Sequence, residues 1–229
     1  MPKLLCDLHI HTSASPDGHC SVDAVLAAAA ERGLDAVAIT DHDSTAAAID
    51  AVSRTDSDVI VIPGIEVSTR DGHVLILGTT KEYERGKPAE ETISEAKKDG
   101  CLVIIPHPYH KFRHAVGLAN PDALALADAL EAYNSRYYTK RSNEEAAKTA
   151  RTLGKPITAG SDAHECMFVG YGRNIIEADE KSAEGILAAI RAGRISAECI
   201  QTPPSVYTKE SYHNVMRKIK HFLHIGRQK

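Results

Sequence analysis

The residues best able to do chemistry near the start of the chain are two histidines, His9 and His11. His9 lies near the end of a short apolar run from Leu4 to Ile10, and His11 follows it directly. Such a run is typical of a buried β-strand. Side chains two positions apart on a strand point to the same face, about 6 to 7 Å apart. Two imidazoles at this spacing can share a metal ion, although strand histidines can also simply meet water or backbone groups.

Further groups of potential ligands recur at the ends of later apolar runs. They are Thr40-Asp41-His42, Gly64-Ile65-Glu66, Gly72-His73, Pro106-His107-Pro108 and Gly160-Ser161-Asp162-Ala163-His164. Each group follows or opens a segment with the apolar character of a strand, so one barrel mouth can gather all of them. This recurrence favours a metal site over isolated histidines.

The segments that must position these residues alternate between short apolar strands and helices. We expect strands at 4–10, 34–40, 59–65, 73–78, 102–105, 129–133, 156–160 and 174–177, and helices at 21–32, 44–53, 88–98, 121–127, 140–153 and 182–192. This alternation is typical of an α/β fold with a parallel sheet, and about seven or eight repeats favour a barrel. In such barrels the functional groups gather at the carboxyl ends of the strands.

Bulk composition sets limits on the class of protein. A chain of 229 residues with 43% hydrophobic content can bury a sizeable core in one domain, and a net charge of −4 argues against a general nucleic-acid coat protein. We expect a cytoplasmic location and no membrane, because no apolar run approaches the roughly 18 to 20 residues that cross a bilayer and no signal region follows Met1. The cysteines are odd in number and scattered, so we expect reduced thiols at Cys6, Cys20, Cys101, Cys166 and Cys199.

The C-terminal stretch differs from the rest of the chain. Between Val206 and Lys229 it carries six Lys or Arg and one acid, Glu210, and its apolar residues recur at helical spacing after Pro203-Pro204. We therefore expect a barrel over residues 1–202 and a basic, helical extension over 203–229 that packs on the barrel. A contact with nucleic acid or another partner is the alternative role for this extension.

The motifs quoted above, with Asp7-Leu8-His9-Ile10-His11 as the first, closely resemble the four motifs of the PHP (polymerase and histidinol phosphatase) family. The resemblance covers residues 4 to about 200, with the motifs in the family's order. It implies a distorted (β/α)7 TIM-like barrel that holds two to three divalent metal ions and hydrolyses phosphate esters.

The resemblance also implies a set of nine ligands. The first metal would be held by His9, His11, Glu66 and Asp162, the second by Glu66 as a bridge with His73 and His107, and the third by Asp17, His42 and His164. Asp17 departs from family members that have histidine there. Mixed nitrogen and carboxylate ligands suit Mn, Fe or Zn. Three carboxylates against three divalent ions leave a positive site, which attracts phosphate.

Within this set we expect a metal-bridging water to lose a proton and attack phosphorus. We expect Asp162, His164 and Asp41 to be the catalytic residues, with Asp41 orienting a ligand or a proton, unless it is an ordinary turn acid. Substrate phosphate is expected to meet cations on loops after the strands, where a guanidinium can hold phosphate in a fork. The candidates, each with a solvated surface charge as its alternative, are Lys111, Arg113, Arg136 and Arg173.

The function that follows is a metal-dependent phosphoesterase for a small phosphate ester, such as a nucleotide 3′,5′-bisphosphate or another phosphomonoester. The alternatives are a 5′-3′ exoribonuclease on short RNA, a non-catalytic metal-binding module, and a hydrolase of amides or lactones. The intact ligand set argues against the non-catalytic module. The acidic charge and the lack of a sizeable insertion favour a small substrate over a long polymer.

Overall fold

The computed structural model describes residues 1–54, 57–111, 113–136 and 140–202. The basic extension expected over residues 203–229 lies outside them. The strands are β1 (Lys3–Ile10), β2 (Ala36–Ile39), β3 (Ile60–Ser68), β4 (His73–Leu77), β5 (Leu102–Ile105), β6 (Ala129–Asn134), β7 (Ile157–Gly160), β8 (Gly172–Glu177) and β9 (Ile195–Cys199).

The helices are α1 (Val22–Glu31), α2 (Ala46–Val52), α3 (Ala89–Lys98), α4 (Val116–Ala119), α5 (Lys140–Thr152) and α6 (Ala183–Arg191), with 3-10 turns η1 (Pro121–Leu126) and η2 (Cys166–Phe168). Ser21 and Ser182 cap α1 and α6 as their sequence positions indicate, each accepting a hydrogen bond from a backbone N–H of the first turn. Among the helices of the described ranges, none is both long and apolar enough to span a bilayer.

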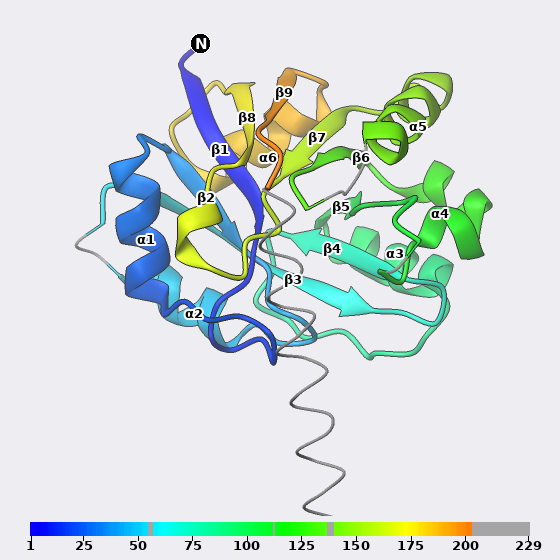
Figure 1. Cartoon of the computed structure of the whole chain (residues 1–229), viewed down its shortest axis with the longest axis horizontal. Helices are drawn as coiled ribbons and strands as arrows, with labels where there is room; N and C mark the ends of the chain where they lie inside the picture. Colours follow the sequence, from blue (N-terminus) through cyan, green and yellow to red (C-terminus); the bar gives the residue numbers. More distant parts are fainter. Residues whose placement is uncertain (55–56, 112, 137–139, 203–229) are drawn as a thin grey trace, which may run out of the picture.

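The strands form one curved sheet in the order β7-β6-β5-β4-β3-β2-β1-β8-β9 (Figure 1). The predicted α/β class and barrel-like shape are confirmed, whereas a purely parallel sheet of seven βα repeats is not found. Strand β4 runs antiparallel to both β3 and β5, and β8 runs antiparallel to both β1 and β9. The short connection from Ser68 to His73 is the reason for the first exception, because it allows a hairpin but no crossover helix.

Strand β7, at one end of the sheet, closes the barrel against β1 and β8 near the other end, and we call this junction the seam. We call the end of the barrel at which the parallel strands finish the rim. There Ile10 pairs with Ala163 in an isolated bridge, and the Asp162 N–H donates to the His9 carbonyl at 2.8 Å. Deeper in the barrel, the side chain of Asn174 on β8 connects this strand to β7 in place of hydrogen bonds between the two backbones. Its side-chain oxygen accepts from the Ala159 N–H, and its amide donates to the Ala159 carbonyl, both at 2.8 Å.

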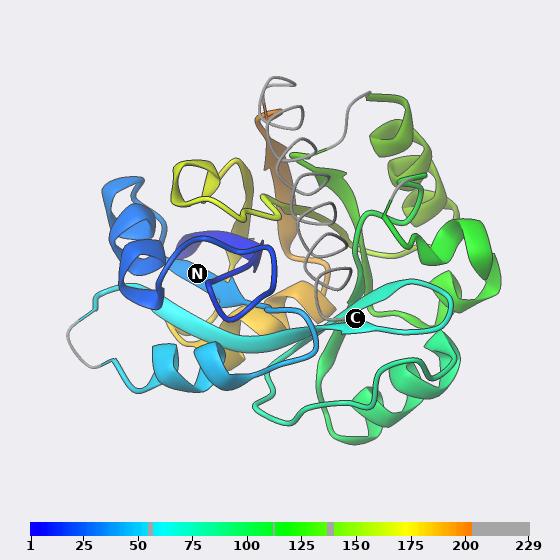
Figure 2. The same ribbon diagram turned by 60° about the horizontal axis from the view of Figure 1, so that its bottom comes forward.

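Hydrophobic side chains fill both the interior of the barrel and its outer faces. The inner cluster joins Leu4, Leu8, Leu75 and other strand residues to α6, which packs against the strands from below the rim with Ile186 and Ile190. Figure 2 shows α1 and α2 on the outside of one half of the barrel and α3, α4 and α5 on the outside of the opposite half. The other main hydrophobic clusters lie under these two groups of helices.

A β-bulge in β1 reverses the alternation of its side chains just before the rim. Between the pairs Asp7–Val37 and Ile10–Ile39, β1 advances by one residue more than β2. As a result Leu8 belongs to the inner cluster while Ile10 packs on the outer side with α1, and His9 therefore faces inward. Bulges of this kind re-aim a side chain next to a functional site.

The expectation of reduced thiols throughout is wrong for one pair of cysteines. Cys20, after β1, and Cys166, after β7, form a disulfide with Cα atoms 5.7 Å apart, although 146 positions separate them in the sequence. Cys6, Cys101 and Cys199 are free thiols. The pairing follows from the seam, because closing β1 against β7 brings the two loops together.

Candidate metal centre

The potential ligands come from six strands but converge on one rim of the barrel. His9 lies in β1, Glu66 in β3, and His11, His42, His107, Asp162 and His164 lie on the loops that follow β1, β2, β5 and β7. His73 instead opens β4. Because β4 is antiparallel to its neighbours, its first residue lies at the same rim as the last residues of the parallel strands.

Glu66 is at the centre of this cluster and faces histidines on both sides. Its Oε1 lies 3.0 Å from His73 Nδ1 and 3.1 Å from His107 Nε2. Its Oε2 lies 3.2 Å from His11 Nε2 and 3.1 Å from His42 Nδ1. This division of contacts between the two oxygens is the arrangement of a carboxylate that bridges two cations.

Asp162 covers the other side of His9 and His11. Its Oδ1 lies 3.8 Å from His9 Nε2, 3.5 Å from His11 Nε2 and 3.4 Å from His164 Nδ1. All of these side chains are almost fully buried. We call His9, His11, Glu66, His73, His107 and Asp162 the inner group.

The remaining three residues form the outer group: Asp17 and His42, which are partly exposed, and His164, which is buried. Asp17 Oδ2 is 3.1 Å from His164 Nε2, and Asp17 Oδ1 is 4.0 Å from His42 Nε2. The Asp17 side chain is 40% exposed and that of His42 is 20% exposed. Asp17 and His164 stand on the two loops that the Cys20–Cys166 disulfide connects.

Two imidazole nitrogens in the inner group face each other, which fits a cation between them. His9 Nε2 and His11 Nε2 are 3.1 Å apart. His9 Nδ1 lies 2.8 Å from the Glu131 carboxylate, and His11 Nδ1 lies 3.1 Å from the Ser15 hydroxyl. Since a carboxylate accepts only, His9 carries its proton on Nδ1 when neutral, and its Nε2 lone pair points at His11.

Geometry across the whole cluster also fits divalent cations. Four groups of three residues place ligand atoms within 4.8 Å of one another: His11, His42 and His164; His9, His11 and Glu66; His9, His107 and Asp162; His42, Glu66 and His73. These groups overlap the expected division into three sites without matching it, because His11 and His42 each serve two groups. Buried ligand atoms without a hydrogen-bond partner among the described residues include Nδ1 of His42, His73 and His107.

Charge inside the cluster displaces several pKa values. Burial would raise the pKa of Glu66, but His73, His42 and His9 hold it well below its ordinary value of 4.5. Burial would lower the pKa of His9, but the charges of Glu131, Asp162 and Glu66 outweigh it and raise that pKa well above 6.5. For the two outer histidines burial prevails, with the pKa of His42 lowered to about 4 and that of His164 to about 3. Burial would raise the pKa of Asp17, but His164 outweighs it and lowers that pKa.

Backbone strain is concentrated at the same rim. His107 has φ of 31° and Asp162 has φ of 51°, in the left-handed region that residues with a Cβ seldom adopt. Strain of this kind persists where surrounding structure imposes it, and it clusters at functional sites. The two residues lie at the ends of β5 and β7, where the chain turns its side chains toward the cluster.

Asp41 does not contact the cluster directly but supports it through Ser15. The Ser15 hydroxyl donates to Asp41 Oδ1 at 2.8 Å and meets His11 Nδ1 at 3.1 Å, while the His42 N–H donates to the Ser15 oxygen at 3.0 Å. Asp41 also accepts two hydrogen bonds from Thr12. Asp41 is thus connected to His11 through Ser15. Ser15 carries no motif signal in the sequence, and only its position on the loop brings it here.

Two of the four predicted substrate-binding cations contact the cluster. Arg113 bonds to Asp162 Oδ2, and Arg136, which is almost fully buried, bonds to His164 Nδ1 and to the Asp162 carbonyl. Lys111 is exposed beside them. Arg173 points away from the barrel interior and pairs with Glu198 at 3.0 Å, because it alternates on β8 with the inward-facing Asn174. The prediction that Arg173 binds substrate therefore gains no support.

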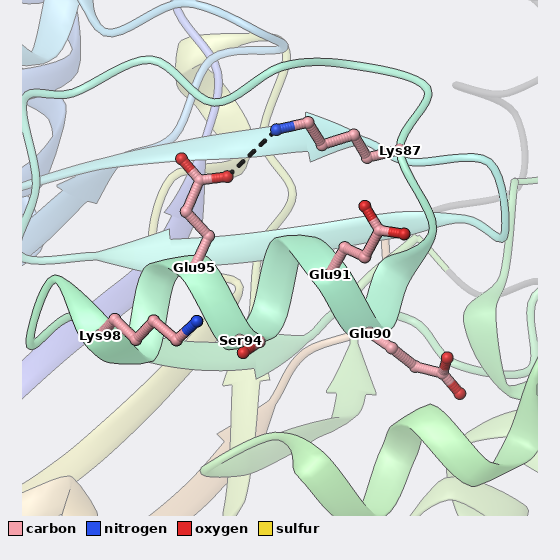
Figure 3. Close-up of a pocket in the computed structure, with 6 residues that line it drawn as sticks. All are labelled: Lys87, Glu90, Glu91, Ser94, Glu95 and Lys98. Atoms are coloured by element: carbon pink, nitrogen blue, oxygen red, sulfur yellow. Dashed lines mark hydrogen bonds and ion pairs between the residues drawn. The ribbon is translucent and has the colours of Figure 1, made fainter.

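A surface hollow on α3 offers a contrast with the rim. It is lined by Lys87, Glu90, Glu91, Ser94, Glu95 and Lys98, whose side chains spread along the outer face of the helix (Figure 3). Lys87 pairs with Glu95 at 3.3 Å. The hollow has the mixed charges of a solvated helix face and no histidine, so the rim cluster is the candidate functional site.

Comparison with known proteins connects this cluster to one family. The family described as PHP-associated matches residues 140–195. An uncharacterized protein of Methanocaldococcus jannaschii is 33% identical over 122 residues, which cover 48% of this chain and 71% of that protein. A probable phosphatase of Shewanella sp. strain ANA-3 is 28% identical over 219 residues, covering 79% of this chain and 86% of that protein.

Two further similarities concern a nuclease and a solved structure. The 5′-3′ exoribonuclease Rnm of Escherichia coli is 44% identical over 69 residues, 29% of this chain and 23% of that protein. A two-domain protein of Bacteroides vulgatus, containing a predicted PHP-like metal-dependent phosphoesterase, superposes with a TM-score of 0.72 at 21% identity. The superposition covers 87% of this chain and 65% of that one, and it shows a shared fold.

Proposed function

The chain belongs to the PHP family of metal-dependent phosphoesterases, and from this premise we propose that its rim cluster holds two to three divalent cations and hydrolyses a small phosphate ester. The observation that carries the proposal is Glu66, whose two carboxylate oxygens face separate pairs of histidines at 3.0 to 3.2 Å. A carboxylate in this position serves two neighbouring cations at once, as hydrolysis at a two-metal site requires.

We propose the following assignment of ligands. His9, His11, Glu66 and Asp162 would hold one cation, and Glu66, His73 and His107 a second. Asp17, His42 and His164 would hold a third. The nitrogen and carboxylate donors suit Mn, Fe or Zn. Bound there, these cations would polarise phosphoryl oxygens and make a water acidic enough to serve as the nucleophile.

The protein's own residues prepare this site in two ways. Ser15, fixed by Asp41, accepts a hydrogen bond from His11 Nδ1 and leaves Nε2 bare toward the cluster. Asp41 is thus a positioning residue in this proposal, not one that touches substrate. Asp162 and His164 act as ligands.

Arg113 and Arg136 give the site its preference for phosphate. Both guanidinium groups lie against Asp162, at the edge of the inner group. A guanidinium binds two phosphate oxygens in a planar fork, which an amide or lactone substrate does not offer. We propose that these two arginines hold a second phosphate group or the phosphate of a nucleotide, which favours a nucleotide 3′,5′-bisphosphate among small substrates.

The test is release of inorganic phosphate from a panel of esters with Mn, Fe or Zn supplied. The panel includes a phosphomonoester, a nucleotide 3′,5′-bisphosphate and a short 5′-phosphorylated RNA. We expect turnover of the small esters, its loss in His9→Ala and Asp162→Ala, and a raised KM for the bisphosphate alone in Arg136→Ala. A protein that binds the cations yet cleaves no ester would contradict the proposal.

A 5′-3′ exoribonuclease is the second candidate, because the Escherichia coli exoribonuclease shares 44% identity over 69 residues. The same panel separates the two functions. Stepwise shortening of 5′-phosphorylated RNA at a rate above that of the bisphosphate would favour the nuclease.

A further inference from the structure

Glu131, a buried carboxylate on β6, contacts the cluster without belonging to the nine proposed ligands. Its Oε2 lies 2.8 Å from His9 Nδ1. Its Oε1 accepts hydrogen bonds from the His107 N–H at 3.2 Å and from the Asn134 side-chain amide at 2.6 Å. The same amide of Asn134 also lies 3.2 Å from Asp162 Oδ2. One carboxylate is therefore connected to three proposed ligands.

We propose that Glu131 is a positioning residue that fixes His9 with its proton on Nδ1, so that Nε2 is always presented to the first cation. The inference deepens the proposed function, since it concerns the same cations. It follows from the donors around Glu131: the His107 N–H and the Asn134 amide donate to Oε1, which leaves Oε2 to accept from His9 Nδ1. Partners of this kind orient ligating histidines and raise their basicity.

Two local features make room for this contact. A β-bulge in β6 places both Glu131 and Asn134 on the inner face, because β6 advances two residues from Glu131 to Tyr133 while β7 advances one. Gly160 of β7 lies directly against the pair, and a Cβ there would overlap Glu131 Oε2 and come within 2.7 Å of His9 Cβ. A bulge and a glycine at matching positions indicate that the backbone is shaped around this hydrogen bond.

The decisive variant is Glu131→Gln, which keeps the shape but carries one acceptor and one donor. Its amide oxygen would satisfy His107 and Asn134, so its NH2 group would face His9 Nδ1. His9 would then keep its proton on Nε2, the nitrogen aimed at the cation. We expect the variant to retain the first cation about 10- to 100-fold less tightly, measured by metal analysis after titration with a chelator.

A matched control is Asp7→Asn, another buried carboxylate, on β1. Asp7 accepts from the backbone N–H groups of His9, Ser161 and Gly170, and it bonds to no imidazole nitrogen. We expect Asp7→Asn to lower the melting temperature of the metal-free protein but to retain the cation like the wild type. Equal cation retention in Glu131→Gln and the wild type would overturn the proposal.

A second measurement does not depend on either variant folding. In the wild-type protein loaded with Zn, nitrogen-15 NMR of the histidine side chains should show His9 with a slowly exchanging Nδ1 proton and metal on Nε2. Metal on Nδ1 of His9 would sink the proposal. Neither readout involves ester cleavage, so a protein that binds Zn in this way but hydrolyses nothing would refute the proposed function and leave the role of Glu131 intact.

Discussion

The inner and outer groups of the rim cluster are built from the same residue types but are held in place differently. His9, Glu66 and His73 of the inner group sit on strands, and the inner side chains other than His73 are almost fully buried. The outer group sits on loops, and its Asp17 side chain is 40% exposed. The Cys20–Cys166 disulfide and a hydrogen bond from the His19 N–H to the His164 carbonyl connect the loops of Asp17 and His164, and Ser15 connects the first of these loops to His42.

This difference affects how firmly each group would hold a cation. A cation in the inner group would be enclosed by groups that cannot move without disturbing the sheet. A cation in the outer group would depend on three loops, those that follow β1, β2 and β7. We therefore expect the inner cations to be retained under conditions that release the outer one, and the following predictions examine that contrast.

The largest effect is expected from Glu66→Gln, which removes the shared carboxylate. The loss of the bridging charge should release both inner cations and lower kcat by about a thousandfold, or about 4 kcal/mol of barrier. Metal analysis and phosphate release measure it, with the exposed Glu198→Gln as control. If only the outer cation were lost, the central role given to Glu66 would be wrong.

A smaller effect is expected from the double substitution Cys20→Ser and Cys166→Ser. Without the cross-link the loop with Asp17 is held to the loop with His164 by non-covalent contacts alone, so the outer cation should bind about 10- to 100-fold more weakly while the inner two stay. Metal stoichiometry is the measurement, and Cys199→Ser, which removes a free thiol, is the control. If the double variant bound the third metal ion as tightly as the wild type, the loops would keep their positions without the disulfide.

The pH dependence should differ between the two groups. Burial opposes protonation of His9 and His73, but nearby carboxylates raise the pKa of both above 6.5. Binding an inner cation must therefore release protons, and its affinity should rise by about tenfold per pH unit for each proton released. The pKa of His42, lowered by burial to about 4, leaves that ligand neutral down to mildly acidic pH.

Calorimetry in buffers of different ionisation enthalpy counts the protons released as metal is added near pH 7. We expect about one or more for the inner cations and close to none for the outer one. Equal proton release for all equivalents would remove the distinction between the groups.

The smallest effect is expected from Arg173→Ala. Its guanidinium pairs with Glu198 on the outer side of β8, away from the cluster, so kcat and KM should change by less than about twofold, as is usual for an exposed ion pair. Steady-state kinetics beside Arg136→Ala measures the contrast. A selective rise of KM in Arg173→Ala would restore the original prediction for this residue.

The sequence predicts the order of most strands and the convergence of His, Asp and Glu residues, because both follow from apolar runs and the motifs at their ends. It misses features that arise from closure of the sheet. The disulfide joins residues 146 positions apart, and His73 reaches the rim only because β4 is antiparallel. Glu131 and Asn134 can be suspected of supporting the metal ligands because they close a strand, but the bulge in β6 that places both on the inner face has no signal in the sequence.

The seam has a consequence for how the protein is made. His9 leaves the ribosome well before its partners across the seam, Asp162 and His164. The two proposed cation sites that include Asp162 or His164 therefore cannot be complete on the growing chain before the segment after β7 is made, although the β3–β4 hairpin already carries Glu66 and His73. Loading of these two cations must follow synthesis of β7, and a chain that stalls before β7 would lack the ligands that close both sites.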